Sequence, residues 1–153
     1  MRIEDILAAD LVLPVLQATT KAGILAELAG TVADHHPEVD RARLLTALED
    51  REKLNSTALG DGVAIPHGKL GGIKRVFAAF GRSPEGVDFE SLDGKPTHLF
   101  FLLVAPEESA GAHLKALARI SRLLKSGEFR ERLLAASDAA AVFATIQDED
   151  AKY

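Results

Sequence analysis

The chain has 153 residues, of which 47% are hydrophobic, and its formal net charge is −5. This size and composition predict one domain over residues 1–153 with an ordinary packed core. Cysteine is absent, which excludes a disulfide framework, a zinc site built on thiolates and a cysteine nucleophile. The negative charge argues against a nucleic-acid partner, because neutralising phosphates requires a concentrated basic face.

The N-terminal segment predicts neither a signal peptide nor a membrane anchor. Asp10 interrupts the apolar residues that follow Arg2 and Glu4, so a hydrophobic signal core does not form. No stretch approaches the roughly 20 apolar residues that cross a bilayer. We therefore expect a cytoplasmic protein without direct membrane insertion.

The chain begins with a predicted strand and a predicted helix. Residues 11–16 are apolar, and Pro14 among them favours an edge strand or a bulge. Thr19 or Thr20 is suited to capping a helix that runs to about Asp34.

A second helix is predicted after the sequence His35-His36-Pro37, which ends the first one. Asp40 is suited to capping it, and its inward stripe consists of Leu44, Leu45 and Leu48. We expect both histidines to lie exposed at the end of the first helix.

The rest of the chain predicts a loop-rich segment, then strands, then helices. The loop-rich segment is 55–72, and strands are predicted at 75–81 and 97–105. The second of these strands has no polar alternation, which predicts a central strand buried on both faces. Three helices follow, at about 110–125, 126–135 and 137–147. We expect the polar residues from Asp148 to 153 to form a frayed tail.

Helices before and after a central group of strands predict an α/β fold, in which helices cover both faces of a sheet. The connections between the strands leave their order open.

The segment 51–69, REKLNSTALGDGVAIPHGK, carries the strongest functional signal. His67 follows Pro66, which favours an extended conformation at the preceding residue, so the imidazole is expected at the end of a short apolar strand, 63–65. An ordinary histidine pKa of ~6.5 leaves a large neutral fraction at cytoplasmic pH, so a ring nitrogen is able to accept a phosphoryl group and surrender it. The alternative is a hydrogen-bonded histidine in a turn.

Arg51 continues the inward stripe of the second helix, three residues after Leu48 and seven after Leu44. An arginine on a core-facing stripe needs an anionic or carbonyl partner. It either bonds carbonyls at the end of its own helix or forms a bidentate contact with a phosphoryl group on His67.

His113 lies in the first turn of the helix 110–125 and shares a stripe with Leu117, Ile120 and Leu124. This spacing predicts that it faces inward. It is either a hydrogen-bonded core histidine or, if it lies near His67, a hydrogen-bond donor to phosphoryl oxygens. The helix start adds free backbone N–H groups and the positive end of a helix dipole.

Ser56 and Thr57 are candidates for binding phosphoryl oxygens, with capping of the turn after the helix as the alternative. Metal binding is not expected, since no carboxylate lies at ligand spacing to His67 and no HExxH pair is present. The glycines at 60 and 62 predict a tight turn and not a Walker loop, because no Gly-Lys-Ser/Thr follows. A serine-hydrolase Gly-x-Ser-x-Gly turn is absent as well.

Together these residues resemble a known family. The signature REK…ST…G-x-G-x-AIPHGK is similar to that of the IIA components of the phosphoenolpyruvate-dependent phosphotransferase system, fructose–mannitol superfamily, and especially to their nitrogen-regulatory branch. The resemblance continues through LFFLLVAP and AGAHLKALARIS and covers nearly the whole chain. It implies a three-layer α/β/α domain with a mixed sheet. Asn55 and Ala58 depart from the pattern, standing where relatives frequently have glycine.

The resemblance also implies a phosphocarrier cycle without cofactors, metals or nucleotides. The donor would be a small histidine-phosphorylated carrier protein (HPr-like), itself charged from phosphoenolpyruvate by an upstream enzyme. His67 corresponds to the histidine that is phosphorylated at Nε2, and Arg51 and His113 correspond to residues that stabilise the phosphoryl group. Such transfer between two imidazoles needs in-line approach and charge stabilisation, with little acid–base chemistry.

Three functions remain open at this point. The first is a regulatory phosphocarrier whose phosphorylation state controls which target proteins it binds. The second is a IIA component that passes phosphate to the IIB part of a fructose/mannitol-type sugar permease. The third is an interaction module that keeps the fold without turning over phosphate; the presence of Arg51, His67 and His113 argues against it.

Overall fold

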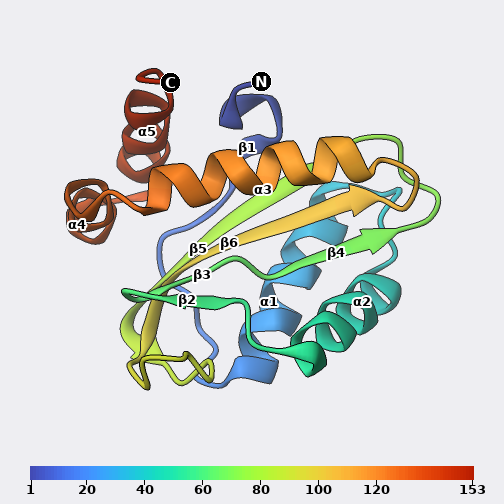
Figure 1. Ribbon diagram of the computed structural model, residues 1–153, viewed down its shortest axis with the longest axis horizontal. Coiled ribbons are helices and arrows are strands. Elements are labelled where there is room, and N and C mark those ends of the chain that lie inside the picture. Colours follow the sequence, from blue (N-terminus) through green and yellow to red (C-terminus); the bar gives the residue numbers. More distant parts are fainter.

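A six-stranded mixed sheet forms the middle layer of the molecule (Figure 1). The computed structural model describes all 153 residues. The strands are β1 (Leu7–Leu13), β2 (Ala58–Gly60), β3 (Val63–Ala64), β4 (His67–Leu70), β5 (Phe77–Val87) and β6 (Thr97–Pro106). Their order is β1-β5-β6-β3-β2, and β4 also pairs with β6. The pairs β1–β5, β3–β6 and β4–β6 are parallel, whereas β5–β6 and β2–β3 are antiparallel.

Helices cover both faces of this sheet, as Figure 1 shows. They are α1 (Lys21–His35), α2 (Arg41–Leu54), α3 (Ala110–Leu124), α4 (Gly127–Ala135) and α5 (Ala139–Asp150), with a short 3-10 turn, η1 (Ile3–Asp5), before β1. The helices α1 and α2 lie on one face and α3 lies on the other, while α5 packs on β1 and η1. The predicted three-layer α/β/α fold with a mixed sheet is therefore confirmed. None of the helices has the length and apolar character that crossing a membrane requires.

Side-chain caps fix where the two helices of the first layer begin. The hydroxyl of Thr20 accepts a hydrogen bond from the backbone N–H of Gly23 at 3.1 Å, and the carboxylate of Asp40 accepts one from Arg43 at 3.0 Å. Each cap satisfies a backbone donor that the first turn of a helix leaves free. Both capping residues were expected from the sequence.

The central strand β6 is buried along nearly its whole length, as its uninterrupted apolar sequence predicts. The first strand differs from its prediction: it spans Leu7–Leu13 instead of 11–16. It ends directly before Pro14, which has no N–H to donate to a ladder.

The segment 55–72 was expected to be loop-rich, yet it contains β2, β3 and β4. A single register runs through β3 and β4, since Val63 is opposite Leu99 and His67 is opposite Leu103. Pro66, between β3 and β4, has no N–H to donate to β6, but its carbonyl still accepts from the N–H of Leu103 at 2.9 Å. His67 consequently begins a second stretch of strand and does not stand at the end of the first.

Two further expectations are wrong. His36 is buried, not exposed, because its ring stacks on Phe77 with 3.9 Å between centroids. The expected frayed tail from Asp148 is instead helix as far as Asp150, and Glu149 and Asp150 are 3% and 1% exposed. Asp150 accepts the backbone N–H of Ile3 at 2.7 Å and the guanidinium of Arg119. The partners that order this segment lie far away in the sequence, which explains the error.

Asp150→Ala should lower the free energy of unfolding by about 2–4 kcal/mol, because it leaves Nε of Arg119 and the buried N–H of Ile3 without their carboxylate acceptor. Urea denaturation monitored by circular dichroism measures this loss. Asp148→Ala is the matched control, since that carboxylate lies in the same helix with its side chain 72% exposed. The control should stay within about 0.5 kcal/mol of the wild type. A loss for Asp150→Ala no larger than that for the control would mean that the contacts of the Asp150 carboxylate contribute nothing measurable to stability.

Candidate functional site

The imidazole of His67 is held in one tautomer by a partner on each ring nitrogen. Its Nδ1 lies 2.7 Å from the carbonyl oxygen of Ile65, and its Nε2 lies 3.2 Å from the Nε of Arg51. A carbonyl only accepts and a guanidinium only donates, so these partners require the hydrogen on Nδ1 and a lone pair on Nε2. The ring is half-buried, and its contacts leave the lone pair on Nε2.

Close packing between α2 and β4 brings Arg51 to His67. Gly68 is buried against α2, and a Cβ added at this position would lie 3.2 Å from the Cβ of Ala47. The absence of a side chain at residue 68 lets the helix approach the strand directly beside the histidine. Arg51 lies four residues after Ala47 on α2, so the same contact sets its distance from His67.

Arg51 bonds the carbonyl at the end of its own helix, which is one of the two alternatives left open by the sequence, and it also contacts the imidazole of His67. Its Nη1 donates to the backbone carbonyl of Asn55 at 3.1 Å and to the side-chain Oδ1 of Asn55 at 3.0 Å, at the end of α2. Its Nε simultaneously donates to His67. The guanidinium therefore links the end of the helix to the imidazole.

His113 lies beside His67, with 5.2 Å between ring centroids and 58° between ring planes. It is 8% exposed, which agrees with the inward stripe predicted for it. Its Nε2 is buried and has no hydrogen-bond partner. Buried polar atoms normally have partners, so an unpaired imidazole nitrogen next to His67 indicates a place for a polar ligand.

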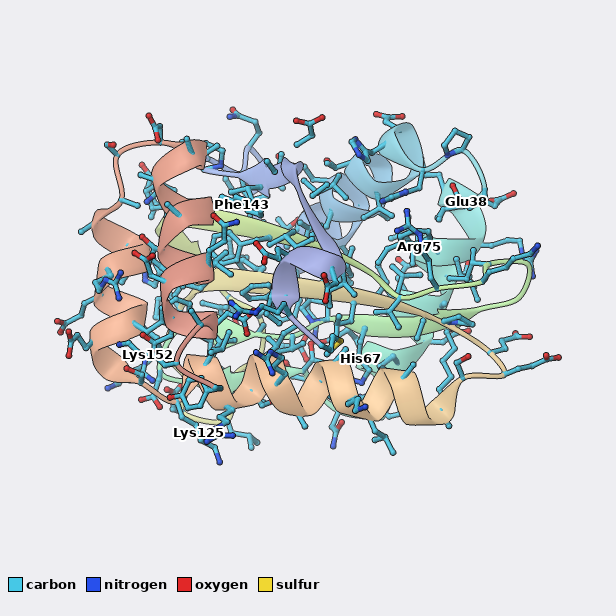
Figure 2. The ribbon with its side chains drawn as sticks, turned by 90° about the horizontal axis from the view of Figure 1, so that it is seen from above. Glu38, His67, Arg75, Lys125, Phe143 and Lys152 are labelled. Atoms are coloured by element: carbon cyan, nitrogen blue, oxygen red, sulfur yellow. The ribbon has the colours of Figure 1, made fainter.

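A hollow of about 490 Å³ opens between α2 and α3 beside β4. Figure 2 shows His67 next to α3. The walls are mostly small or apolar, and the polar groups among them are the guanidinium, the two imidazoles and one ammonium. The lining residues are Ala47, Arg51, His67, Gly68, Lys69, Ala110, His113, Leu114 and Leu117.

Burial lowers the pKa of both histidines in this hollow. For His67 the loss of solvent acts first, and the positive charge of Arg51 lowers the pKa further, against the opposing effects of the Ile65 carbonyl and Glu52. For His113 burial again lowers the pKa most, followed by His67 and Lys69. The net effect disfavours a positive ring in both cases, so both imidazoles are neutral near pH 7.

The hydroxyls of Ser56 and Thr57 are engaged away from the hollow. Ser56 donates to the carbonyl of Phe89 at 2.6 Å and accepts from the N–H of Ala58 at 3.1 Å. Thr57 is buried and donates its hydroxyl to the carboxylate of Glu52. Neither residue lines the hollow. The geometry thus favours the turn-capping alternative over phosphoryl binding for both.

Glu52 is a structural residue of the site that the sequence analysis missed. It is buried, accepts the N–H of Thr57 at 3.2 Å and forms an ion pair with Lys21 at 3.0 Å. It thereby ties the segment after α2 to α1. Its position, four residues after Leu48 on the inward stripe, is the signal that would have identified it.

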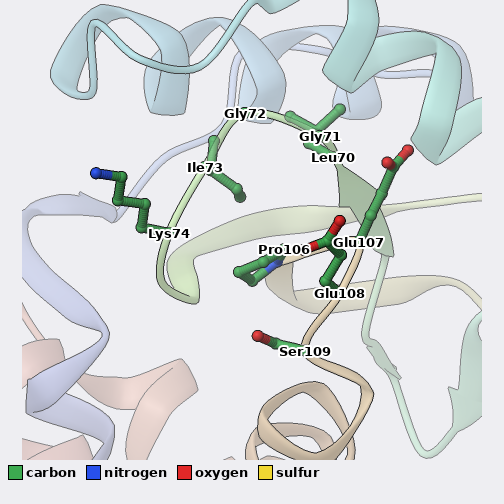
Figure 3. Close-up of a pocket in the computed structure, with 9 residues that line it drawn as sticks. All are labelled: Leu70, Gly71, Gly72, Ile73, Lys74, Pro106, Glu107, Glu108 and Ser109. Carbon is green, nitrogen blue, oxygen red and sulfur yellow. The ribbon is translucent and has the colours of Figure 1, made fainter.

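A second hollow, of about 320 Å³, lies where β4 and β6 end. It is lined by residues 70–74 and 106–109 (Figure 3). Lys74 points away from Glu107 and Glu108, so the charged groups do not converge on one point (Figure 3). No cluster of three or more histidines, cysteines or carboxylates suited to a metal ion occurs in the molecule. The hollow around His67 is the one in which reactive groups gather.

Comparison with known proteins identifies the family of the chain. Residues 5–149 match the model of the family described as "Phosphoenolpyruvate-dependent sugar phosphotransferase system, EIIA 2". The chain belongs to this family. Within the EIIA 2 family it is 44% identical to a nitrogen regulatory protein of Bradyrhizobium diazoefficiens, over 95% of both chains.

Two further proteins are similar along the chain as well. The crystal structure of the nitrogen regulatory protein IIA-Ntr from Neisseria meningitidis superposes with a TM-score of 0.87 at 34% identity, covering 94% of this chain and 98% of that one. The fructose-specific EIIABC component of Bacillus subtilis is 38% identical over 98% of this chain, which corresponds to 24% of that protein.

Gly68→Ala should destabilise the protein by about 1 kcal/mol, because the new methyl group must push Ala47 and α2 away from β4. Urea denaturation of Gly68→Ala, Ala47→Gly and the double variant completes a double-mutant cycle. The double variant should lose less stability than the sum of the two single variants, since removing one methyl group makes room for the other. Strictly additive losses would show that this contact does not limit the approach of α2.

Both His67 and His113 should titrate below the ordinary histidine pKa of about 6.5, as measured by nuclear magnetic resonance of the ring carbons. Because the pKa is lowered in the folded state, the unfolded chain binds more protons just below this pH. Stability should therefore fall as pH drops through about 6.5 and be retained above it. Urea denaturation at pH 7.5 and 5.5 measures this change.

Arg51→Met should raise the pKa of His67 by removing the adjacent positive charge, whereas Arg43→Met on the exposed part of the same helix should leave it unchanged. A pKa of His67 that is insensitive to Arg51 would contradict the contact between the two side chains.

Proposed function

We propose that this protein is a cytoplasmic phosphocarrier of the phosphotransferase system, acting as one IIA-type domain over residues 1–153. His67 accepts a phosphoryl group on Nε2 from a histidine-phosphorylated, HPr-like carrier protein. The observation that carries this proposal is the tautomer of His67, because the bond from Nδ1–H to the Ile65 carbonyl leaves the Nε2 lone pair as the nucleophile. A neutral imidazole beside a guanidinium is suited to receiving an anionic group.

In the transfer step, the Nε2 lone pair attacks the phosphorus of the donor's phosphohistidine in line with the N–P bond that breaks. The electron pair of that bond returns to the donor's imidazole. His67 loses no proton, because its hydrogen stays on Nδ1. The ring therefore gains positive charge as the new N–P bond forms, and the Ile65 carbonyl stabilises it by accepting from Nδ1–H.

Arg51 and His113 stabilise the phosphoryl oxygens in this proposal. Arg51 already donates to Nε2, so its guanidinium lies where the group arrives. His113 is 8% exposed, and its buried Nε2 has no hydrogen-bond partner. Preorganised donors of this kind need no reorganisation when charge develops.

We assign the protein a regulatory role, in which its phosphorylation state controls the binding of target proteins. The supporting observation is similarity to a nitrogen regulatory protein over 95% of both chains. The alternative is a transport IIA component that passes phosphate to the IIB part of a sugar permease. It rests on similarity to 24% of a fructose-specific EIIABC component and, at 36% identity, to 81% of a fructose-specific EIIA component. Transfer of label from the phosphorylated protein to a fructose IIB domain would favour this alternative.

His67→Ala should abolish labelling when the protein is mixed with phosphoenolpyruvate, the upstream enzyme and the carrier. Arg51→Ala should slow labelling on the order of a hundredfold and His113→Ala about tenfold, because each removes a donor to the phosphoryl oxygens. Intact-mass spectrometry follows the gain of one phosphoryl group, which acid should release from a phosphohistidine.

Two exposed residues serve as matched controls: His35→Ala for the histidines and Arg43→Ala for the arginine. Both should be labelled at the wild-type rate. An acid-stable phosphate, or labelling that survives His67→Ala, would contradict the proposal. His113→Ala should keep a cooperative thermal transition; a collapsed transition would instead mark His113 as a core residue.

A further inference from the structure

We propose that Asn55 is a positioning residue, whose side-chain amide holds the guanidinium of Arg51 against Nε2 of His67. The inference deepens the proposed function, since it concerns how the same site is kept ready, and its kinetic consequence rests on that function.

Two nitrogens of the Arg51 guanidinium make different contacts: Nη1 bonds Asn55, and Nε bonds His67. Nη1 of Arg51 donates to two acceptors of Asn55, the backbone carbonyl at 3.1 Å and the side-chain Oδ1 at 3.0 Å. Nε donates to Nε2 of His67 at 3.2 Å. A guanidinium is planar and rigid, so holding Nη1 on two acceptors sets the direction of the Nε–H bond.

The contacts of Nε and Nη1 change differently during phosphoryl transfer. The lone pair that attacks phosphorus is the one that accepts from Arg51 in the resting protein, so the bond from Nε must break as the new N–P bond forms. The bonds from Nη1 to Asn55 use another nitrogen and need not break. Asn55 therefore serves as the pivot about which the guanidinium turns from the imidazole nitrogen to the phosphoryl oxygens.

The backbone of residue 55 does not itself require asparagine. Its φ of −171° and ψ of 160° describe an extended conformation that any residue adopts. The residue is exposed, so its amide is not needed to fill the core either. Its contribution at this position is the second acceptor for Nη1, without which a long and half-buried arginine side chain regains rotamer freedom.

Asn55→Ala tests the inference because it removes the amide and keeps the backbone carbonyl. In nuclear magnetic resonance spectra of the unphosphorylated protein, the Nε–H of Arg51 should lose its protection against hydrogen exchange by about three- to tenfold, the effect of one lost hydrogen bond. The pKa of His67 should rise, because the positive neighbour is no longer held beside it. Asn55→Asp retains an oxygen acceptor and should restore the protected Arg51 signal.

Leu54→Ala is the matched control, since Leu54 is the adjacent residue, uncharged and 80% exposed. It should change neither the Arg51 signal nor the titration of His67. A residue that only caps the end of α2 would alter the thermal midpoint without altering these two signals.

The rate of His67 labelling by the phosphorylated carrier should fall about three- to tenfold in Asn55→Ala. The inference is overturned if the Arg51 signal of Asn55→Ala equals that of the wild type, or if its labelling rate does. Failure of the wild type to take up any phosphoryl group would instead overturn the proposed function, and the resonance measurements on the unphosphorylated protein would still decide the role of Asn55.

Discussion

The hydrogen bond from Nδ1–H of His67 to the carbonyl of Ile65 is the interaction on which the geometry of the site depends. It joins two residues on either side of Pro66, so the local chain alone fixes which ring nitrogen carries the lone pair. Because the same edge continues in register along β6 on both sides of the proline, the acceptor carbonyl is held rigidly. Strand pairing beside the proline thereby determines the tautomer of the imidazole.

The rest of the site is built by bringing two helices to this edge from opposite layers. Arg51 comes from α2 on one face and His113 from α3 on the other. In the unphosphorylated protein the guanidinium donates to Nε2 of His67, whereas a buried ring nitrogen of His113 has no partner. Such local incompleteness within a well-packed fold is typical of functional sites, where stability is exchanged for reactivity.

Local patterns predicted the features that depend on neighbours in the sequence. The caps at Thr20 and Asp40, the buried strand β6 and the inward position of His113 follow from spacing and side-chain chemistry. Patterns failed where the deciding partner is distant. His36 is buried by Phe77 and Asp150 is ordered by Ile3 and Arg119, none of which lies near it in the chain. Ser56 and Thr57 were candidates for binding phosphoryl oxygens, but their hydroxyls bond Phe89 and Glu52 and do not face the hollow.

The sequence by itself determined the α/β class, the three residues of the site and the family resemblance, because these rest on residue type, periodicity and an ordered motif. Only the tertiary structure decided that His67 begins a strand beside β6, and that Arg51 of α2 and His113 of α3 both meet its ring. These properties depend on distances between atoms of different elements. Packing sets such distances to a fraction of an ångström, and no pattern of residues along one chain specifies them.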